Sequence, residues 1–91
     1  MAIVAHFELS NLDQDKYLEA VRRLEEAGMG APTGRLHHAF YGDGPDLRVT
    51  EIWDTPQHFQ AFGQVLMPIL GAMGVEAGPP EVLPVHNIIR G

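Results

Sequence analysis

The chain has 91 residues, which is enough for one domain over residues 1–91 and leaves no room for a second. It has no cysteine, so neither a disulfide nor a thiolate metal site can stabilise it. Twelve acidic residues against six scattered basic ones give a net charge of −6, which excludes the positive surface that nucleic acid or an anionic membrane would need.

The first half of the chain predicts a strand, a helix and a β-hairpin, in that order. Residues 2–9 alternate between apolar and polar side chains, which is typical of a strand with one buried face. A helix over 13–27 follows, because Asp13 is a favourable N-cap residue and apolar side chains recur behind it at helical spacing. Residues 35–41 and 47–53 predict two further strands, and the Gly-Asp-Gly-Pro turn between them indicates an antiparallel hairpin.

The second half predicts a broken helix and a last strand. A capping threonine followed by proline suits the start of a helix, so we expect residues 57–66 to be helical. Pro68 lacks the amide hydrogen that a helix interior uses, so the sequence predicts a break there and a short separate turn or helix over 67–78. Residues 81–90 predict the last strand.

This order of elements, β-α-β-β-α-β, predicts a ferredoxin-like α+β fold. Right-handed connections place both helices on one face of a four-stranded antiparallel sheet and leave the other face uncovered. The last strand is apolar on both faces, whereas a strand with a wet face normally alternates. We therefore expect the uncovered face to pack against a second copy of the chain in a homodimer. No apolar run is long enough to cross a membrane and no secretion signal is visible, so we expect a cytoplasmic protein.

Three segments carry a resemblance to a known superfamily. They are the strand end Val49-Thr50-Glu51-Ile52-Trp53-Asp54-Thr55, the helical segment Phe59-Gln60-Ala61-Phe62, and the tail Pro79-Pro80-Glu81-Val82-Leu83-Pro84-Val85-His86-Asn87. With the order of elements, they resemble the dimeric α/β-barrel superfamily, in which two sheets close face to face into one barrel. The first two segments are similar to the antibiotic biosynthesis monooxygenase branch, and the tail is similar to a group of small uncharacterised bacterial proteins.

The resemblance implies an enzyme that acts on a small aromatic or polyketide-like molecule without a metal or a cofactor. Monooxygenases of this branch use an Asn, a Trp and a Tyr in the pocket; Trp53 and Tyr41 match the last two as substrate-binding residues, and no Asn of this chain is matched. Polyketide-cyclase members use a His on the first strand, which His6 matches, while their Tyr-His partner has no match here.

Strand parity predicts one cluster that could carry chemistry. The apolar set of the first strand faces the helices, which turns His6 toward the uncovered face. The first strand is central in this fold, so His86 on the last strand and Glu51 on the third are expected beside it as further catalytic residues. His38 joins them as a substrate-binding residue if its parity agrees. An imidazole would then act as the base, and Glu51 would orient it.

The sequence leaves two other interpretations open. The histidines can be structural, in which case the protein is a non-catalytic dimer that binds a small molecule or an accessory partner. Three imidazoles and a carboxylate are also an acceptable ligand set for Zn, Cu or Fe. They lack the local spacing of a metal motif, however, so we expect no metal.

Overall fold

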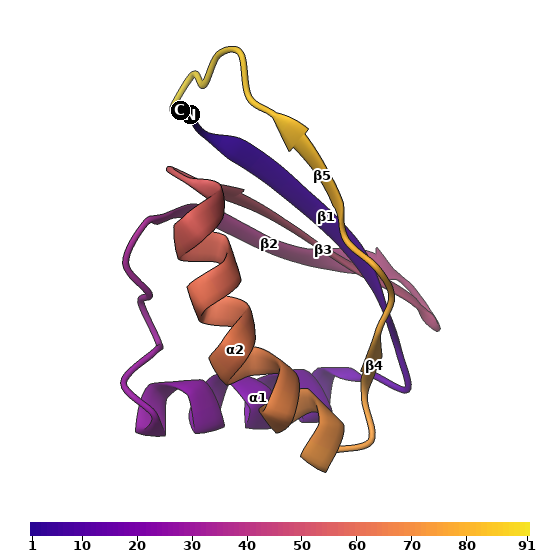
Figure 1. Cartoon of the computed structure of the whole chain (residues 1–91). Coiled ribbons are helices and arrows are strands. Elements are labelled where there is room, and N and C mark those ends of the chain that lie inside the picture. The colour runs from indigo at the N-terminus through magenta and orange to yellow at the C-terminus, as the bar shows by residue number, and fades with distance from the viewer.

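All 91 residues are described by the computed structural model, and they form two helices packed against one antiparallel sheet (Figure 1). The elements in chain order are β1 (Ile3–Ser10), α1 (Gln14–Glu26), β2 (Arg35–Asp43), β3 (Asp46–Trp53), α2 (Pro56–Ala72), β4 (Glu76–Ala77) and β5 (Glu81–Pro84). The strands lie in the order β2-β3-β1-β4, and β5 also pairs with β1. This is the ferredoxin-like α+β arrangement that the sequence predicts, with β1 in the interior of the sheet.

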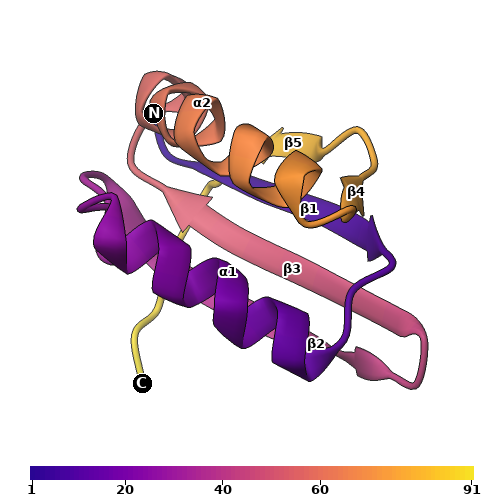
Figure 2. The same cartoon turned by 90° about the horizontal axis from the view of Figure 1, so that it is seen from below.

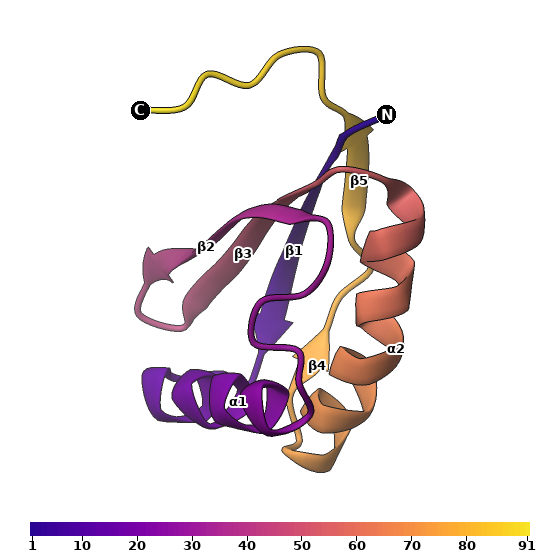
Figure 3. The same cartoon turned by 90° about the vertical axis from the view of Figure 1, so that its left-hand side faces the viewer.

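Both helices cover the same face of the sheet (Figures 2 and 3). The alternation of β1 explains this, because Ile3, Ala5, Phe7 and Leu9 are buried while the residues between them are half-buried or exposed. Burying one stripe of each helix against this apolar row supplies most of the driving force for the fold. The opposite face of the sheet is covered by neither helix.

The two helices begin where the local chemistry predicts. Asp13 is the N-cap of α1, and its side chain accepts a hydrogen bond from the backbone N–H of Lys16 at 2.7 Å. Thr55 caps α2 in the same way by accepting from the backbone N–H of His58, and Pro56 occupies the first turn, where no amide hydrogen is needed.

The predicted break at Pro68 is wrong, because α2 runs as one helix through it to Ala72. Proline removes the hydrogen bond to the carbonyl of Gln64. Both Pro68 and Gln64 are exposed, so water can satisfy that carbonyl and the helix continues. Neither α1 nor α2 has the length and apolar character of a membrane-spanning segment.

The predicted last strand is too long. β5 ends at Pro84, which is paired with Ile3 at the very start of β1. Just before β1, the carbonyl of Ala2 accepts a hydrogen bond from Val85 N–H at 2.9 Å, and the pairing of β5 with β1 goes no further. The last residues therefore have no strand partner, and they leave the sheet as an extended tail (Figure 3).

Candidate functional site

Glu51 is a charged residue in the core of the protein, with only 2 % of its surface exposed. It lies on β3 between Val49 and Trp53, so strand alternation turns its side chain toward the helices. Its Oε1 accepts a hydrogen bond from the indole Nε1–H of Trp53 at 3.2 Å. No buried side-chain nitrogen or oxygen lacks a hydrogen-bond partner, so both oxygens of this buried carboxylate are hydrogen-bonded.

His38 links this carboxylate to Tyr17 on α1. Its Nδ1 lies 2.6 Å from Oε2 of Glu51, and its Nε2 lies 2.7 Å from the hydroxyl of Tyr17. An ionised carboxylate can only accept, so Nδ1 carries the hydrogen, and Nε2 accepts from the tyrosine hydroxyl when the ring is neutral. The carboxylate therefore selects the tautomer of His38 and fixes the plane of its ring.

Burial raises the pKa of the Tyr17 phenol above its ordinary value; Arg35 opposes this rise and Glu51 adds to it. Tyr17 also stacks on Phe40 of β2, with ring centroids 4.0 Å apart and the rings inclined by 3°. The phenol is thus a neutral hydrogen-bond donor at neutral pH, and its ring is held in place against the sheet.

Arg35 supplies the positive charge that balances Glu51. Its guanidinium donates to Oε2 of Glu51 at 3.4 Å and to the carbonyl of Gly30 at 3.3 Å. The same group lies over the ring of Phe62, 5.6 Å from the ring centroid. With His38 neutral, the arginine and the carboxylate leave the cluster without net charge.

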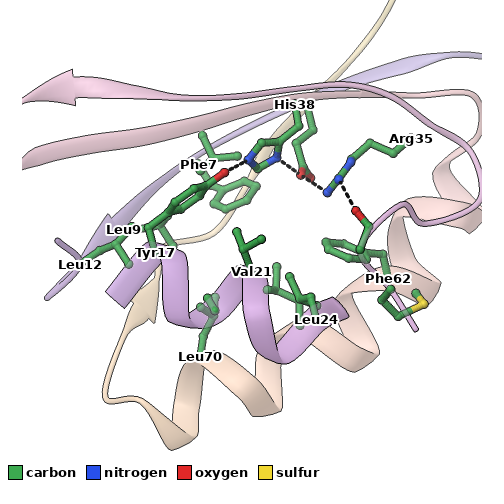
Figure 4. A pocket seen from close by; sticks show the side chains of 16 residues that line it. Phe7, Leu9, Leu12, Tyr17, Val21, Leu24, Arg35, His38, Phe62 and Leu70 are labelled. Carbon is green, nitrogen blue, oxygen red and sulfur yellow. Dashed lines mark hydrogen bonds and ion pairs between the residues drawn. The ribbon is translucent and has the colours of Figure 1, made fainter. Parts of the chain in front are cut away.

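These polar groups lie at one side of an apolar cavity of about 150 Å³ between the sheet and the helices (Figure 4). Twelve of its 16 lining residues are hydrophobic, Tyr17 among them. The titratable side chains in the lining are Tyr17, Arg35, His38 and Glu51. Figure 4 shows the imidazole of His38 between Tyr17 and the carboxylate, with Val21 and Leu24 of α1 across the cavity. The arrangement is that of a pocket with an apolar body and a few convergent polar groups.

No family model and no curated protein matches the sequence. Solved structures do match the fold. A structural-genomics protein named YjcS superposes over 94% of this chain and all of its own, with a TM-score of 0.68 at 13% identity. A candidate antibiotic biosynthesis monooxygenase from Chloroflexus aurantiacus J-10-fl covers all of both chains, with a TM-score of 0.64 at 16% identity. SnoaB from Streptomyces nogalater, a cofactor-independent oxygenase, covers 99% of this chain and 96% of its own, with a TM-score of 0.59 at 14% identity.

The chain shares the ferredoxin-like fold of these solved structures. The resemblance found in the sequence is therefore confirmed at the level of fold. Identities this low show the fold alone, since one fold can host unrelated activities.

Within this fold, the cluster predicted from strand parity is divided between the two faces of the sheet. His6 does lie on the uncovered face, where its Nδ1 is 3.0 Å from the Thr50 hydroxyl and 3.1 Å from the Tyr41 hydroxyl. Glu51 does not lie beside it. Glu51 is opposite Ala5 in the register of β1 and β3, and Ala5 faces the helices. The predicted contact between His6 and Glu51 is therefore wrong.

His86 is also misplaced in that prediction. It follows β5 on the exposed tail, and the residue of β5 that pairs with His6 is Glu81. His38 lies on the helix side with Glu51, so the three imidazoles are in three separate places. The structure contains no group of three His, Cys, Asp or Glu side chains that could hold a metal ion.

Trp53 and Tyr41, the two residues matched to a monooxygenase pocket, also lie apart. Trp53 is completely buried against Phe59 and Phe62 of α2, with ring centroids 5.9 and 5.3 Å away. It does not line the cavity but contacts it through its hydrogen bond to Glu51. Tyr41 is exposed on the uncovered face of the sheet, bonded to Thr50 and His6.

Sequence reasoning missed Tyr17 and Arg35 as site residues. Tyr17 is indistinguishable in the sequence from an ordinary core residue of an amphipathic helix, and nothing local signals its contact with His38. The hairpin did carry a usable signal. A turn centred on Gly44 and Pro45 pairs Asp43 with Asp46, and counting back from there sets His38 opposite Glu51.

Proposed function

We propose that this cavity is an active site in which His38 acts as a general base, oriented by Glu51, on a small molecule with an aromatic ring. The observation that carries the proposal is the chain of hydrogen bonds from Glu51 through His38 to Tyr17 at the wall of an apolar cavity. A carboxylate on one imidazole nitrogen and a proton-exchanging group on the other is the arrangement that activates a histidine base.

The proposed step is removal of a proton from an O–H or an activated C–H bond of the substrate. The substrate group would replace the Tyr17 hydroxyl at Nε2 of His38, and Tyr17 would then donate its hydrogen bond to a substrate oxygen. The proton goes to Nε2, and the electron pair stays on the substrate. The cluster changes from no net charge to +1, because Arg35 and the imidazolium now face one carboxylate. A positive cluster stabilises the substrate anion formed in the same step.

The size and polarity of the cavity limit the substrate. A cavity of about this volume binds benzene in another protein, so roughly one aromatic ring fits here. The lining is apolar except on the side of His38, so the ring would enter with its acidic group toward that residue.

The same anion can lead to oxygenation, cyclisation or isomerisation. We propose oxygenation first, because the fold is shared with a cofactor-independent oxygenase. In that reaction the carbanion adds O2 to form a hydroperoxide, which loses water and leaves a carbonyl, so that CH2 and O2 become C=O and H2O. No metal or organic cofactor enters this scheme.

A non-catalytic binding protein is the alternative, and one observation favours it. The Tyr17 hydroxyl already occupies Nε2 of His38, so the polar chain is complete without a substrate. In that case the cavity binds a small apolar molecule and the hydrogen bonds serve only stability.

Exchange of substrate protons for deuterium distinguishes an active site from a non-catalytic binding site. Phenylacetone has one aromatic ring and an acidic CH2 beside its carbonyl, and its exchange in D2O is followed by NMR. We expect the protein to accelerate exchange and His38→Gln to reduce that acceleration about a hundredfold or more. His37→Gln is the matched control, because His37 is the exposed neighbour on the opposite face of β2. Binding of phenylacetone without any exchange would establish the alternative, and equal loss in both variants would refute a role for His38.

We also propose that the chain forms a homodimer through the uncovered face of the sheet. Val4, Ile52 and Leu83 lie side by side across three adjacent strands there, and each is exposed or half-buried in the single chain. An apolar row on a sheet surface is normally covered by a partner.

A further inference from the structure

A second cavity lies beside the candidate active site, between α2 and the segment that connects β4 to β5. Its volume is about 230 Å³. Phe59 and Met67 line it from the helix, and Pro79 and Pro80 line it from the connecting segment. None of its lining residues has a polar or charged side chain, whereas the first cavity has four. The second cavity can therefore hold hydrocarbon but offers nothing for a reacting group.

The two cavities share a wall of three residues. Phe7, Phe62 and Leu66 line both of them, and Figure 4 shows Phe7 and Phe62 among the side chains around the first cavity. The two phenylalanines are buried, but Leu66 is only half-buried. An aliphatic side chain with one open side can change rotamer without disturbing the core. Leu66 is thus the part of the wall that can move most easily.

Gly63 keeps the second cavity open from the middle of α2. A glycine in a helix interior is less favourable than an alanine. A side chain would fit at this position, because a Cβ placed on Gly63 meets no atom within 4 Å. The helix therefore carries an unfavourable residue where no steric constraint requires it, and the consequence is apolar space beside the active site.

We propose that the second cavity is a subsite for a hydrocarbon substituent of the substrate, which reaches it past Leu66 while the reacting ring stays beside His38. This proposal rests on the proposed use of the first cavity and adds the substrate class. The substrate is an aromatic molecule with its acidic group at one end and an alkyl or aryl substituent at the other. Leu66 and Gly63 set the length of that substituent.

Two phenols test the subsite, and Trp53 reports their binding. It is the single tryptophan of the chain, and its indole donates to Glu51 at the first cavity. Para-cresol fits the first cavity alone, whereas para-pentylphenol adds four methylenes that would enter the second. Each fully buried methylene tightens binding about fourfold, so even partial burial of the chain should give a gain of roughly tenfold or more.

Gly63→Leu fills the second cavity. It should abolish the higher affinity for para-pentylphenol and leave the affinity for para-cresol unchanged. Gly71→Leu is the matched control, because Gly71 is another glycine of α2 with open space around it and lines neither cavity. Leu66→Ala removes part of the wall between the two cavities and should increase the affinity for para-pentylphenol relative to para-cresol.

Failure of the subsite and failure of the proposed catalysis give different results. The subsite is refuted if no phenol binds, if para-pentylphenol binds no better than para-cresol, or if Gly63→Leu still binds para-pentylphenol more tightly. Each of these results refutes it even when phenylacetone exchange depends on His38. If Gly63→Leu loses the higher affinity for para-pentylphenol, Gly71→Leu keeps it and no phenylacetone exchange is seen, the subsite stands. The protein then binds this class of molecule without acting as a base.

Discussion

His38 and Glu51 are directly opposite each other in the register of β2 and β3, and Nδ1 of His38 lies 2.6 Å from Oε2 of Glu51. Their partnership is thus built into the hairpin itself. Tyr17 then joins it from α1 when the helix packs on the sheet. The hairpin sets the orientation of the imidazole, and helix packing brings the phenol to its free nitrogen.

Glu51→Gln should impair both the proposed base and the stability of the fold. The amide keeps the shape of the side chain but removes the charge that Arg35 and His38 contact. We expect the free energy of unfolding to fall by about 1–3 kcal/mol, measured by urea unfolding with Trp53 fluorescence. Phenylacetone exchange should fall with it. A variant as stable and as active as the unmodified protein would show that the carboxylate has neither role.

The acid side of the stability curve should depend on Glu19. Hydrogen bonds from Arg22 and then Arg23 lower the pKa of Glu19 from 4.5 to about 2. Because the folded pKa is below the unfolded one, this stabilisation is present above pH 4.5 and is lost as the pH falls toward 2. In Glu19→Gln, the free energy of unfolding should therefore fall less between pH 4.5 and 2 than in the unmodified protein. Added salt should reduce the difference between the two proteins, because the ion pairs are at the surface. Parallel urea titrations at successive pH values measure both effects.

Gly34→Ala should be strongly destabilising. Gly34 has φ +90°, and a Cβ there would overlap both Oδ1 of Asp54 and Nδ1 of His58. Those two side chains are hydrogen-bonded at 2.7 Å, and the contact from His58 lowers the pKa of Asp54. We expect a loss of about 2–4 kcal/mol in urea unfolding. Gly44→Ala separates the cost of positive φ from the cost of the steric overlap, because Gly44 also has positive φ but has open space around it. It should cost roughly 1 kcal/mol.

Pro68→Ala should stabilise the protein. The alanine restores the amide hydrogen that can bond to the carbonyl of Gln64 inside α2. Part of the gain is offset because proline also restricts the unfolded chain, so we expect an increase of about 1–3 kcal/mol. Pro56→Ala, in the first turn of the same helix, should give no such increase. Thermal unfolding of the two variants side by side measures the difference, and equal effects would contradict the argument.

Leu83→Glu should dissociate the proposed homodimer. Leu83 is opposite Val4 on the uncovered face of the sheet, whereas the neighbouring Val82 is opposite Ala5 and has the other orientation. Both side chains are substantially exposed in the single chain, so Val82→Glu is a control of equal chemistry on the wrong face. Light scattering should report a dimer for the unmodified protein and for Val82→Glu, and a monomer for Leu83→Glu. A monomer for the unmodified chain at micromolar concentration would refute the proposal.

Local features of the fold could be read from the amino-acid sequence. The alternation of β1 placed His6 on the uncovered face, and Asp13 marked the start of α1, because strand parity and helix capping depend only on neighbouring residues. The order of elements and the fold follow from such local patterns. The extent of β5 could not be read in this way, because it depends on pairing with β1, and that pairing stops at Ile3, the first residue of β1.

The candidate site depends on contacts between elements. Parity shows which residues of one strand share a face, but it does not relate the face of one strand to that of the next. Glu51 lies opposite Ala5 rather than His6 because of the register between β1 and β3, and a shift of one residue would have reversed its side. The meeting of Tyr17 with His38 depends further on how α1 sits on the sheet, which is set by the packing of the whole core.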